Sequence, residues 1–432
     1  MSLLYSIKTL FAYKDFFRAH CGPIFKIYQK IASRKQDEAF HQLKGKRTLE
    51  VAFFLTIPGM WKSDYLYDLM KNDERFHPYI VIFPYSVYKG LNDEELLRTL
   101  KNTESFIAAK GFEYLIPYDS NNNKWIDIRK THNPDVVFFT TPYKDMFPKY
   151  YIYNYFDKAT CYIPYGFSSL NIYHINYDLI FHNIVGMHFV ETDIHKTTAK
   201  LHSRNKGENI FVSGYLGTEV YMRNDYIPKN IWKSQSKNKK KVIWAPHHTI
   251  GDTFNISNFL KYYNQMLALA TKYQDDLQFA FKPHQLLKFK LIELWGKEKT
   301  EQYYHKWEEM DNTQLIETDY VDLFITSDAM IHDCGSFTSE YLHTKKPVMY
   351  LVKENVDPQN QFSDFGNLSF SKHYHGYSIE DIENFLQNVV ISGDDPLMEE
   401  RKLFFDNYLY PKDGIMPSQK VINLLMEKIY SD

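Results

Sequence analysis

The stretch TDYVDLFITSDAMIHDCGSFTSEYLHTKKPVMYL, residues 318–351, decides how this chain can fold. Apolar residues lead into the polar run from His332 to Ser336, a helix carrying Glu340 is expected next, and Lys346-Pro347 opens another strand. This order of strand, tight polar loop and helix presents backbone N–H groups and a positive helix end to an anion. Gly335 would allow a phosphate to approach the backbone closely. The stretch therefore predicts a site for a nucleotide or its diphosphate.

Alternating strand and helix patterns surround this stretch and predict two Rossmann-like domains with mainly parallel sheets. The clearest helix covers residues 93–110, with Asn92 as its N-cap. A second helix is expected over residues 258–273, and further ones over 385–390 and 420–429. The expected strands are residues 49–57, 79–83, 112–116, 136–140, 160–163, 188–191, 210–213, 242–245 and 277–282.

The domain boundaries are predicted where the alternation of strands and helices is interrupted. Pro228 and the lysine-rich run WKSQSKNKKK, residues 232–241, predict a linker over residues 221–241. The expected parts are a basic helical segment at 1–47, an acceptor domain at 48–220, a nucleotide-donor domain at 242–395 and C-terminal helices at 396–432. In open parallel sheets ligands bind at the carboxyl ends of the strands, so the two domains are expected to face a central cleft.

Composition and charge bound the function. Of the 432 residues 44% are hydrophobic and 24% charged, as in a folded globular protein. The net charge of -2 argues against a nucleic-acid partner. Three cysteines are too few and too scattered for a disulfide framework or a zinc site, and no apolar run is long enough to span a membrane. A cytoplasmic protein is expected.

The first 47 residues carry ten Lys or Arg against three acidic residues, a balance of +7. Apolar residues recur at helical spacing from Leu3 to Phe17 and, after Gly22-Pro23, from Ile24 to Ile31. Two interpretations stay open. The segment is a peripheral anchor on the anionic inner face of the cell membrane, or it is a pair of helices packed on the first domain.

Two further loops place polar residues directly after strands. His247, His248 and Thr249 follow one strand, and Lys282 and His284 follow the next. Their expected role is contact with the phosphates of a donor, because a leaving phosphate needs positive charge and hydrogen-bond donors. The alternative is a polar loop that only caps the sheet. The same donor role is predicted for His332, Asp333, Gly335, Ser336, Phe337 and Glu340, with Glu340 on a ribose hydroxyl.

The first domain offers a candidate acceptor loop at residues 164–169. It contains Tyr165, Gly166 and Ser168, and Trp61 and Tyr65 follow the first strand as candidates for lining an acceptor groove. Most aromatic residues belong to cores, which is the competing interpretation for the last two.

The succession of these loops resembles the CDP-glycerol glycerophosphotransferase family, which makes teichoic acids and related capsular polymers. The resemblance rests on the Ala245-to-Thr249 loop, the Lys282-Pro283-His284 loop, the Asp333-to-Ser336 loop with Glu340, and Lys346-Pro347. It implies a GT-B-like fold, a CDP-linked polyol donor and peripheral membrane attachment. By position, His284 matches the family's donor-site histidine and Ser336 a phosphate-contacting serine.

One departure concerns the general base. The family's Trp-His-Gly motif appears here as Pro164-Tyr165-Gly166, and a tyrosine with an ordinary pKa of about 10 is a poor base. His174, His247 or His248 could serve as the base in its place, so the identity of the base stays open. The predicted catalytic residues are His284, His248 and Tyr165.

The resulting hypothesis is transfer of a polyol phosphate, most simply glycerol phosphate, from a CDP-linked donor to a glycan or lipid-linked acceptor. The alternatives are a GT-B glycosyltransferase that uses a nucleotide sugar for surface polysaccharide, and a non-catalytic nucleotide- or glycan-binding scaffold. No Asp-x-Asp pair follows a strand, so neither a metal nor another cofactor is expected.

Overall fold

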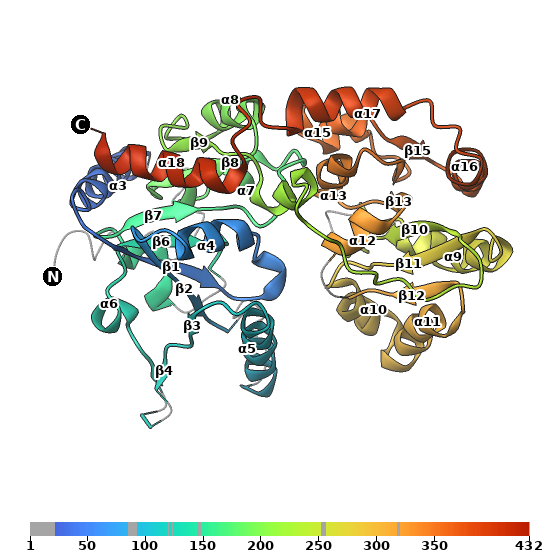
Figure 1. Cartoon of the computed structure of the whole chain (residues 1–432), viewed down its shortest axis with the longest axis horizontal. Coiled ribbons are helices and arrows are strands. Elements are labelled where there is room, and N and C mark those ends of the chain that lie inside the picture. The colour runs from blue at the N-terminus through green and yellow to red at the C-terminus, as the bar shows by residue number, and fades with distance from the viewer. Residues whose placement is uncertain are drawn as a thin grey trace. The chain divides into compact units, whose positions relative to one another are not determined.

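The computed structural model in Figure 1 describes residues 22–84, 93–119, 121–122, 124–144, 148–251, 256–317 and 320–431. The chain forms two compact units. Unit 1 takes its residues from 1–166, Tyr173–Gly217 and Ile415–Asp432. Unit 2 consists of Phe167–Ile172 and Thr218–Gly414. The first amphipathic helix, expected between Leu3 and Phe17, and the expected cap Asn92 lie outside the described residues.

Unit 1 is built on a parallel sheet. Within the described ranges seven strands pair in the order β3-β2-β1-β6-β7-β8-β9. The sheet consists of β1 (Leu49–Leu55), β2 (Phe76–Ile82), β3 (Tyr114–Leu115), β6 (Val136–Phe139), β7 (Ala159–Tyr162), β8 (Met187–Val190) and β9 (Ile210–Val212). Connections run through α4 (Asp64–Lys71), α5 (Asp93–Ala108), the small antiparallel pair β4 (Tyr118–Asp119) and β5 (Lys124–Trp125), α6 (Ile128–Thr131), α7 (Tyr173–Tyr177) and α8 (Asp193–His202).

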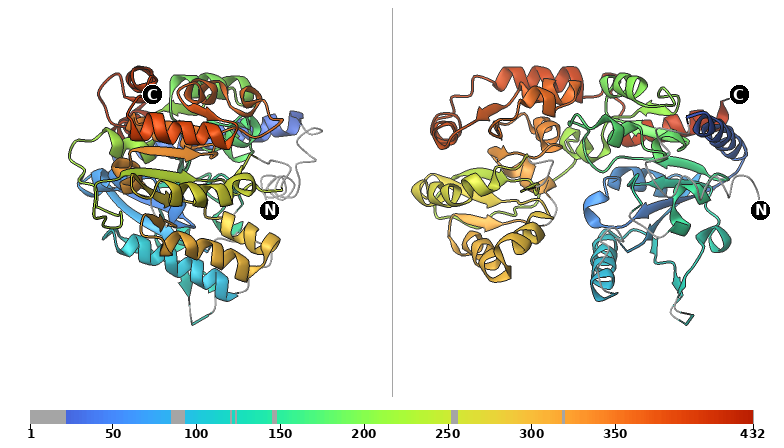
Figure 2. Two further views of the ribbon diagram at one scale, coloured as in Figure 1. Left: turned by 90° about the vertical axis from the view of Figure 1, so that its right-hand side faces the viewer. Right: turned by 180° about the vertical axis from the view of Figure 1, so that it is seen from behind.

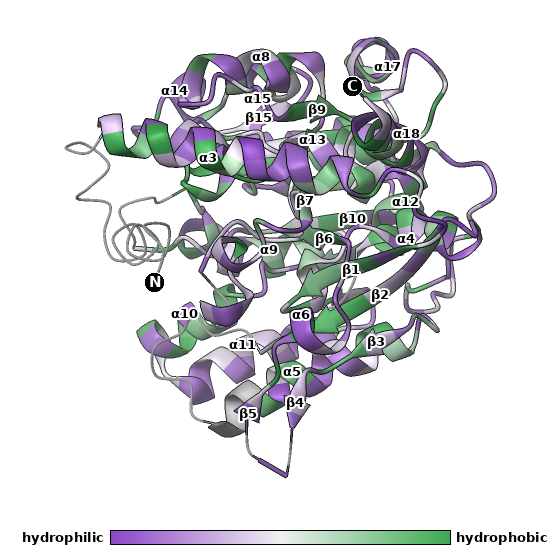
Figure 3. Ribbon diagram, turned by 90° about the vertical axis from the view of Figure 1, so that its left-hand side faces the viewer, coloured by the Kyte–Doolittle hydropathy of each residue, from purple (hydrophilic) through white to green (hydrophobic). Residues whose placement is uncertain are grey.

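Helices from both ends of the described chain complete unit 1. α3 spans Gly22–His41, starting at the predicted break Gly22-Pro23, and buries Phe25, Tyr28 and Phe40. Figure 3 shows its alternation of hydrophobic and hydrophilic residues. α18 (Pro417–Tyr430) contacts α3 and α4 and adds Val421, Leu425 and Ile429 to the core. In the right-hand view of Figure 2, α18 (red) lies beside α3 (dark blue). The last helix, predicted to form a separate C-terminal segment, therefore belongs to the first unit.

Unit 2 repeats the same design. Six described strands, all parallel, pair in the order β12-β11-β10-β13-β14-β15. The strands are β10 (Lys240–Ala245), β11 (Leu277–Phe281), β12 (Thr313–Leu315), β13 (Ala329–His332), β14 (Val348–Leu351) and β15 (Tyr374–Gly376). The helices are α9 (Phe259–Lys272), α10 (Leu287–Trp295), α11 (Lys297–Glu309), α12 (Val321–Thr326), α13 (Phe337–Glu340), α14 (Pro358–Gln361), α15 (Asp364–Phe370), α16 (Ile379–Asn384), its π-helical continuation Phe385–Ile391, and α17 (Met398–Phe404).

The stretch that decides the fold contains a helix before its strand. Residues Val321–Thr326 form α12, and the strand itself is only Ala329–His332. Lys346 ends α12, because its ammonium donates to the carbonyls of Phe324 (3.1 Å), Ile325 (2.5 Å) and Ser327 (2.5 Å). A cation at a helix C-terminus satisfies carbonyls that have no partner within the helix. The Lys-Pro pair thus fixes a helix end in addition to opening β14.

The predicted linker packs on unit 2. Trp232 is buried and its indole N–H donates to Thr326 Oγ1 at 2.9 Å. The backbone of Lys233 donates to Gln314 Oε1 at 2.8 Å and accepts from Gln278 Nε2 at 2.9 Å. These bonds attach the segment to the edge of the sheet at β11 and β12. Among the described residues, no helix is long and apolar enough to cross a membrane.

Unit 1 buries two stacked histidines. The rings of His182 and His188 lie 5.1 Å apart at 20°, and both side chains are buried. Burial lowers the pKa of His188 from 6.5 to about 3. It also lowers the pKa of His182, with a smaller contribution from His188. Both rings are therefore neutral in the folded chain at neutral pH.

The substitution His188→Phe should flatten the acid branch of the stability curve. In the unfolded chain His188 binds a proton as the pH falls below its ordinary pKa of 6.5. In the folded chain it stays unprotonated down to about pH 3. Stability present above pH 6.5 is therefore lost as the pH falls through this range. Removing one such group should reduce the slope of unfolding free energy against pH by up to about 1.4 kcal/mol per unit.

Urea unfolding between about pH 4 and 7 measures this slope. The control is His305→Phe, because His305 is exposed and Glu308 and Glu309 raise its pKa. The control should not reduce the slope. An unchanged slope in His188→Phe would contradict the assignment of a neutral buried ring.

Candidate functional site

The loops that follow β10, β11 and β13 meet at one edge of the unit 2 sheet. β10 is paired with both of the other strands, with Trp244 opposite Phe281 and Ala245 opposite His332. Because the pairings are parallel, all three carboxyl ends lie on the same side. The three loops that the sequence predicts to bind the donor substrate therefore lie close together in unit 2.

Three imidazole rings cluster at this edge. Ring centroids are 4.3 Å apart for His247 and His248, 4.1 Å for His248 and His284, and 5.0 Å for His247 and His284. One nitrogen from each ring can be chosen so that all three lie within 4.8 Å of one another. The backbone fixes the two loops, since His284 N–H donates to Pro246 O at 3.0 Å and Lys282 N–H to Trp244 O at 2.8 Å.

The rings of His247 and His284 are neutral at neutral pH. His247 and His284 keep a partly exposed edge, although protein surrounds most of each ring. Burial, helped by His248, lowers the pKa of His247 from 6.5 to about 3. Burial also lowers the pKa of His284 well below its usual value, with further contributions from the neighbouring histidines and Lys282. Burial disfavours the charged imidazolium, and three crowded rings cannot all carry a charge.

Hydrogen bonds assign the protons on two of the rings. Nδ1 of His284 accepts from the backbone N–H of Leu286 at 3.2 Å. Nδ1 of His247 accepts from the backbone N–H of Thr249 at 3.4 Å and lies 3.0 Å from the Thr249 hydroxyl oxygen. A neutral ring that accepts at Nδ1 carries its proton on Nε2. Each ring therefore offers an Nε2–H donor, and Lys282, only 8% exposed, adds a cation to the same loop.

Asp333 organises these loops from inside the protein. Its side chain is fully buried, and its two oxygens accept from the backbone N–H groups of His247 (2.6 Å) and Asn258 (2.5 Å). Burial raises the pKa of Asp333 to about 6, opposed by these two hydrogen bonds. The predicted direct contact between Asp333 and a donor does not agree with this burial. Asp333 acts as a positioning residue for the β10 loop and the start of α9.

His332 is equally enclosed. Its ring is fully buried at the end of β13, and Nδ1 accepts from the backbone N–H of Cys334 at 3.1 Å. Burial lowers its pKa to about 3. Its hydrogen bond orders the β13 loop from inside the protein, and the predicted contact of His332 with a donor stays a prediction.

Gly335 makes room for protein instead of a phosphate. A Cβ atom at this position would lie 2.6 Å from Cδ1 of Leu170. Leu170 belongs to Phe167–Ile172, a segment that the sequence placed in the first domain and that the structure places in unit 2. The space beside the Gly335 backbone, predicted to hold a ligand, is thus occupied by the Leu170 side chain of the same unit.

The segment Phe167–Ile172 is bonded to the start of α13 and to α15. Ser169 Oγ lies 2.7 Å from Ser339 Oγ, which lies 2.9 Å from Ser369 Oγ. The rings of Phe167 and Phe365 stack at 5.5 Å. Ser168, a predicted acceptor residue, lies within this segment and its carbonyl accepts from Ser363 Oγ at 3.4 Å. Sequence reasoning missed this docking, because no local pattern indicates which unit a short loop joins.

The other residues of the β13 loop differ in their access. Ser336 is half-buried and begins α13 without a side-chain cap. Phe337 is also half-buried, with its ring 5.1 Å from that of Tyr320. Glu340 is 1% exposed, and its carboxylate accepts from Tyr320 O–H at 2.7 Å and from Phe167 N–H at 3.5 Å. In this arrangement Glu340 is not open to a ribose hydroxyl, whereas Ser336 remains accessible.

The candidate acceptor residues of unit 1 lie in several places. Trp61 is buried in the core, with its indole N–H donating to Asp64 at 2.6 Å, which corrects its predicted place in a groove. Tyr65 is half-buried on α4. The backbone carbonyl of Tyr165 accepts from Tyr215 O–H at 2.8 Å, and Gly166 is the last residue of unit 1 before the docked segment. The roles predicted for Tyr65, Tyr165 and Gly166 stay predictions.

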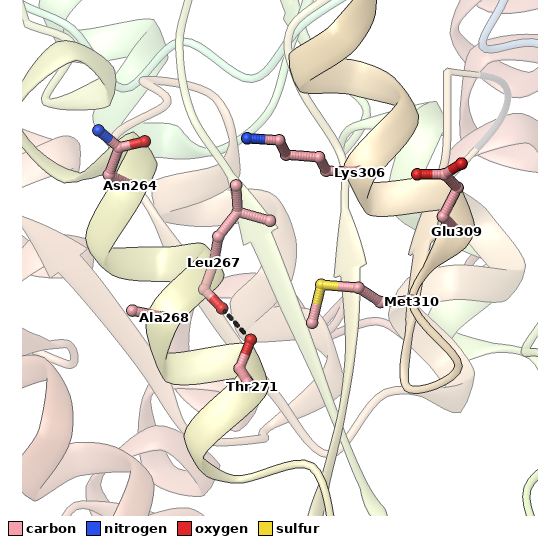
Figure 4. A pocket seen from close by; sticks show the side chains of 7 residues that line it. All are labelled: Asn264, Leu267, Ala268, Thr271, Lys306, Glu309 and Met310. Atoms are coloured by element: carbon pink, nitrogen blue, oxygen red, sulfur yellow. Dashed lines mark hydrogen bonds between the residues drawn. The ribbon is translucent and has the colours of Figure 1, made fainter.

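A separate hollow of about 330 Å³ lies between α9 and α11, shown in Figure 4. It is near the C-terminal ends of both helices. Because α9 starts beside the histidine loops, the hollow is at the opposite edge of the sheet. Its lining comprises Asn264, Leu267, Ala268, Thr271, Lys306, Glu309 and Met310.

No protein-family model matches the chain, and no curated protein is similar enough to count as a match. Solved structures do match in fold. The Staphylococcus aureus MnaA–UDP complex has a TM-score of 0.56 at 14% identity, over 88% of this chain and 96% of that one. A putative UDP-N-acetylglucosamine 2-epimerase from Listeria monocytogenes has a TM-score of 0.55 at 13% identity, over 89% and 97%.

A third match is UDP-GlcNAc 2-epimerase from Neisseria meningitidis bound to UDP-GlcNAc, with a TM-score of 0.50 at 13% identity, over 89% of this chain and 100% of that one. Likenesses at this level of identity show the fold. They confirm the predicted α/β, GT-B-like class with two Rossmann-like domains. They do not support the CDP-glycerol glycerophosphotransferase family specifically.

The substitution Gly366→Ala tests the docking of Phe167–Ile172 on unit 2. A Cβ at Gly366 would lie 1.9 Å from the backbone oxygen of Ser169, so the segment must move. We expect a loss of about 3 kcal/mol in unfolding free energy, at the upper end of overpacking costs. Gly22→Ala is the control, because no atom of the described residues lies within 4 Å of its added Cβ. Equal stabilities of the two variants in urea would contradict the docking.

The substitution Asp333→Asn tests the organising carboxylate. An amide leaves one acceptor oxygen and turns its NH₂ toward a backbone N–H. We expect a loss of about 1–3 kcal/mol, the cost of one unsatisfied buried group. Thermal and urea unfolding measure it against Asp275→Asn, a change at an exposed position. An unchanged unfolding free energy in Asp333→Asn would show that the two hydrogen bonds do not hold the loops.

Proposed function

We propose that this chain is an enzyme that binds a nucleoside-diphosphate sugar on unit 2 and transfers the sugar to a glycan or lipid-linked acceptor for a cell-surface polysaccharide. The observation that carries the proposal is the pair of neutral imidazoles with Nε2–H donors beside Lys282, at the carboxyl edge of a parallel sheet. Two matched structures contain UDP or UDP-GlcNAc, which favours a uridine nucleotide as the first to test.

The chemistry of this edge suits a diphosphate. Glycosyl transfer breaks the bond between the anomeric carbon and the terminal phosphate oxygen, and an acceptor hydroxyl forms the new bond. Negative charge then grows on the departing diphosphate, where N–H donors and a cation lower the barrier. Neutral imidazoles donate without the cost of burying further charge, and Lys282 supplies the counter-charge.

Asp333 supports this role indirectly. By accepting from His247 N–H it fixes the backbone that carries two of the three rings. Fixed donors need no reorganisation when the diphosphate departs, which is the condition for effective electrostatic catalysis. Ser336, at the start of α13, is an additional candidate for contact with the same diphosphate.

Transfer of a polyol phosphate from a CDP-linked donor is the second candidate. The motifs that favour it are the Ala245-Pro246 and Lys282-Pro283-His284 loops, which lie side by side in the structure. Both reactions need the same kind of contacts to the phosphates of the donor, but they break different bonds. Sugar transfer releases a nucleoside diphosphate, whereas polyol-phosphate transfer releases a nucleoside monophosphate and creates a phosphodiester.

Peripheral contact with an anionic membrane accompanies the proposal. In α3, Ile24 and Ile27 are 43% and 57% exposed, with Lys26 and Lys30 exposed beside them. Exposed apolar residues flanked by cations suit the surface of an anionic membrane. A lipid-linked acceptor would be reached there.

The substitution Lys282→Met should weaken binding of UDP and of the UDP-sugar at least tenfold. The change keeps the buried alkyl chain and removes a charge-assisted contact worth about 1.5–3 kcal/mol. Calorimetric titration measures the affinity, with Lys297→Met as the exposed control. Equal affinities in both variants would place the nucleotide elsewhere.

Incubation with UDP-GlcNAc, other nucleotide sugars, CDP-glycerol and CDP-ribitol identifies the reaction. Phosphorus NMR should show release of a nucleoside diphosphate and no new phosphodiester. A phosphodiester product would establish the second candidate, and binding without turnover would leave the scaffold alternative.

A further inference from the structure

Unit 2 places three imidazoles where a single ion could contact all of them. His247 and His248 come from the loop after β10, and His284 comes from the loop after β11. One nitrogen of each ring lies within 4.8 Å of the other two. In a tetrahedral zinc site the Zn–N distance is about 2.0–2.1 Å, so ligand nitrogens lie about 3.4 Å apart. Ring rotations that close the largest gap by roughly 1.4 Å would reach that spacing.

The ligand set selects a class of metal. Imidazole nitrogen suits zinc, copper and nickel, whereas magnesium and calcium require oxygen ligands. The adjacent carboxylate of Asp333 already accepts from two backbone N–H groups. Histidine binds a metal as the neutral imidazole, through one of its two ring nitrogens.

The tautomers of these rings make metal coordination less favourable. Nε2 of His284 carries the proton, because Nδ1 accepts from Leu286 N–H. Coordination through Nε2 moves this proton to Nδ1 and breaks that hydrogen bond. His247 also accepts at Nδ1, from Thr249 N–H, and would lose that bond in the same way. Each lost buried hydrogen bond weakens affinity by about 10- to 100-fold. Protein zinc sites bind tightly enough to tolerate such a loss.

We propose that His247, His248 and His284 form a binding site for one divalent transition-metal ion. Three protein ligands leave the fourth position of a tetrahedral ion open for water or another oxygen ligand. Metal coordination would use the ring nitrogens that the proposed nucleotide function assigns as donors to the diphosphate, so a metal ion and a diphosphate would compete for the same rings. Metal binding without nucleotide therefore tests the metal site separately.

The test uses the full chain without a histidine tag, stripped of metal by a chelator. Titration with Zn²⁺ against a colorimetric chelator should show one ion bound per chain, and excess Mg²⁺ should not compete. His247→Gln and His284→Gln should each weaken Zn²⁺ binding at least 100-fold. His305→Gln, at an exposed histidine between Glu308 and Glu309, should leave this affinity unchanged.

Cobalt gives a readout on the unaltered chain, so the result does not depend on how a variant folds. Co²⁺ follows similar ligand preferences and absorbs visible light strongly when tetrahedral. An intense band that Zn²⁺ abolishes supports the site. A spectrum like that of hydrated Co²⁺, or equal Zn²⁺ affinity in His284→Gln and His305→Gln, would overturn it.

Discussion

The hydrogen bonds accepted by the buried carboxylate of Asp333 are the constraint on which the candidate site depends. One oxygen accepts from the loop after β10 and the other from the start of α9, while the residue itself follows β13. Three segments that are distant in sequence are thus held by one side chain. Hydrogen bonds to a charged group contribute about 1.5–3 kcal/mol each, and removal of the acceptor leaves buried donors unsatisfied. Asp333 thus holds the loop that carries His247 and His248, and the backbone N–H of His284 donates to Pro246 O of that loop.

This constraint separates the residues that organise the site from those that face outward. His332 and Glu340, like Asp333, are buried and bonded to neighbouring protein groups. The three histidines and Ser336 are partly exposed, and Lys282, although buried, lies in the same loop as His284. The docked segment Phe167–Ile172 then covers Gly335 and closes one side of the β13 loop. Fewer residues of the stretch 318–351 are therefore available to a ligand than the sequence motif indicated.

Sequence reasoning predicted the parallel sheets because buried parallel strands alternate with helices in recognisable apolar runs. It also predicted the meeting of His247, His248 and His284, since loops after neighbouring parallel strands share an edge. It did not predict that Asp333 points inward, because loop carboxylates that cap backbone groups look the same in sequence as those that face ligands. The placement of Leu170 and α18 depended on long-range packing. The sequence patterns typical of metal sites, paired aspartates and closely spaced cysteines, do not reveal a cluster of ring nitrogens that two separate loops bring together.

The most direct test of the central claim is a crystal structure of the chain with UDP. The account predicts that phosphate oxygens lie within hydrogen-bonding distance of Nε2 of His247 or His284 and of Nζ of Lys282. A diphosphate bound away from the loops after β10 and β11, with these three side chains facing only solvent, would contradict it.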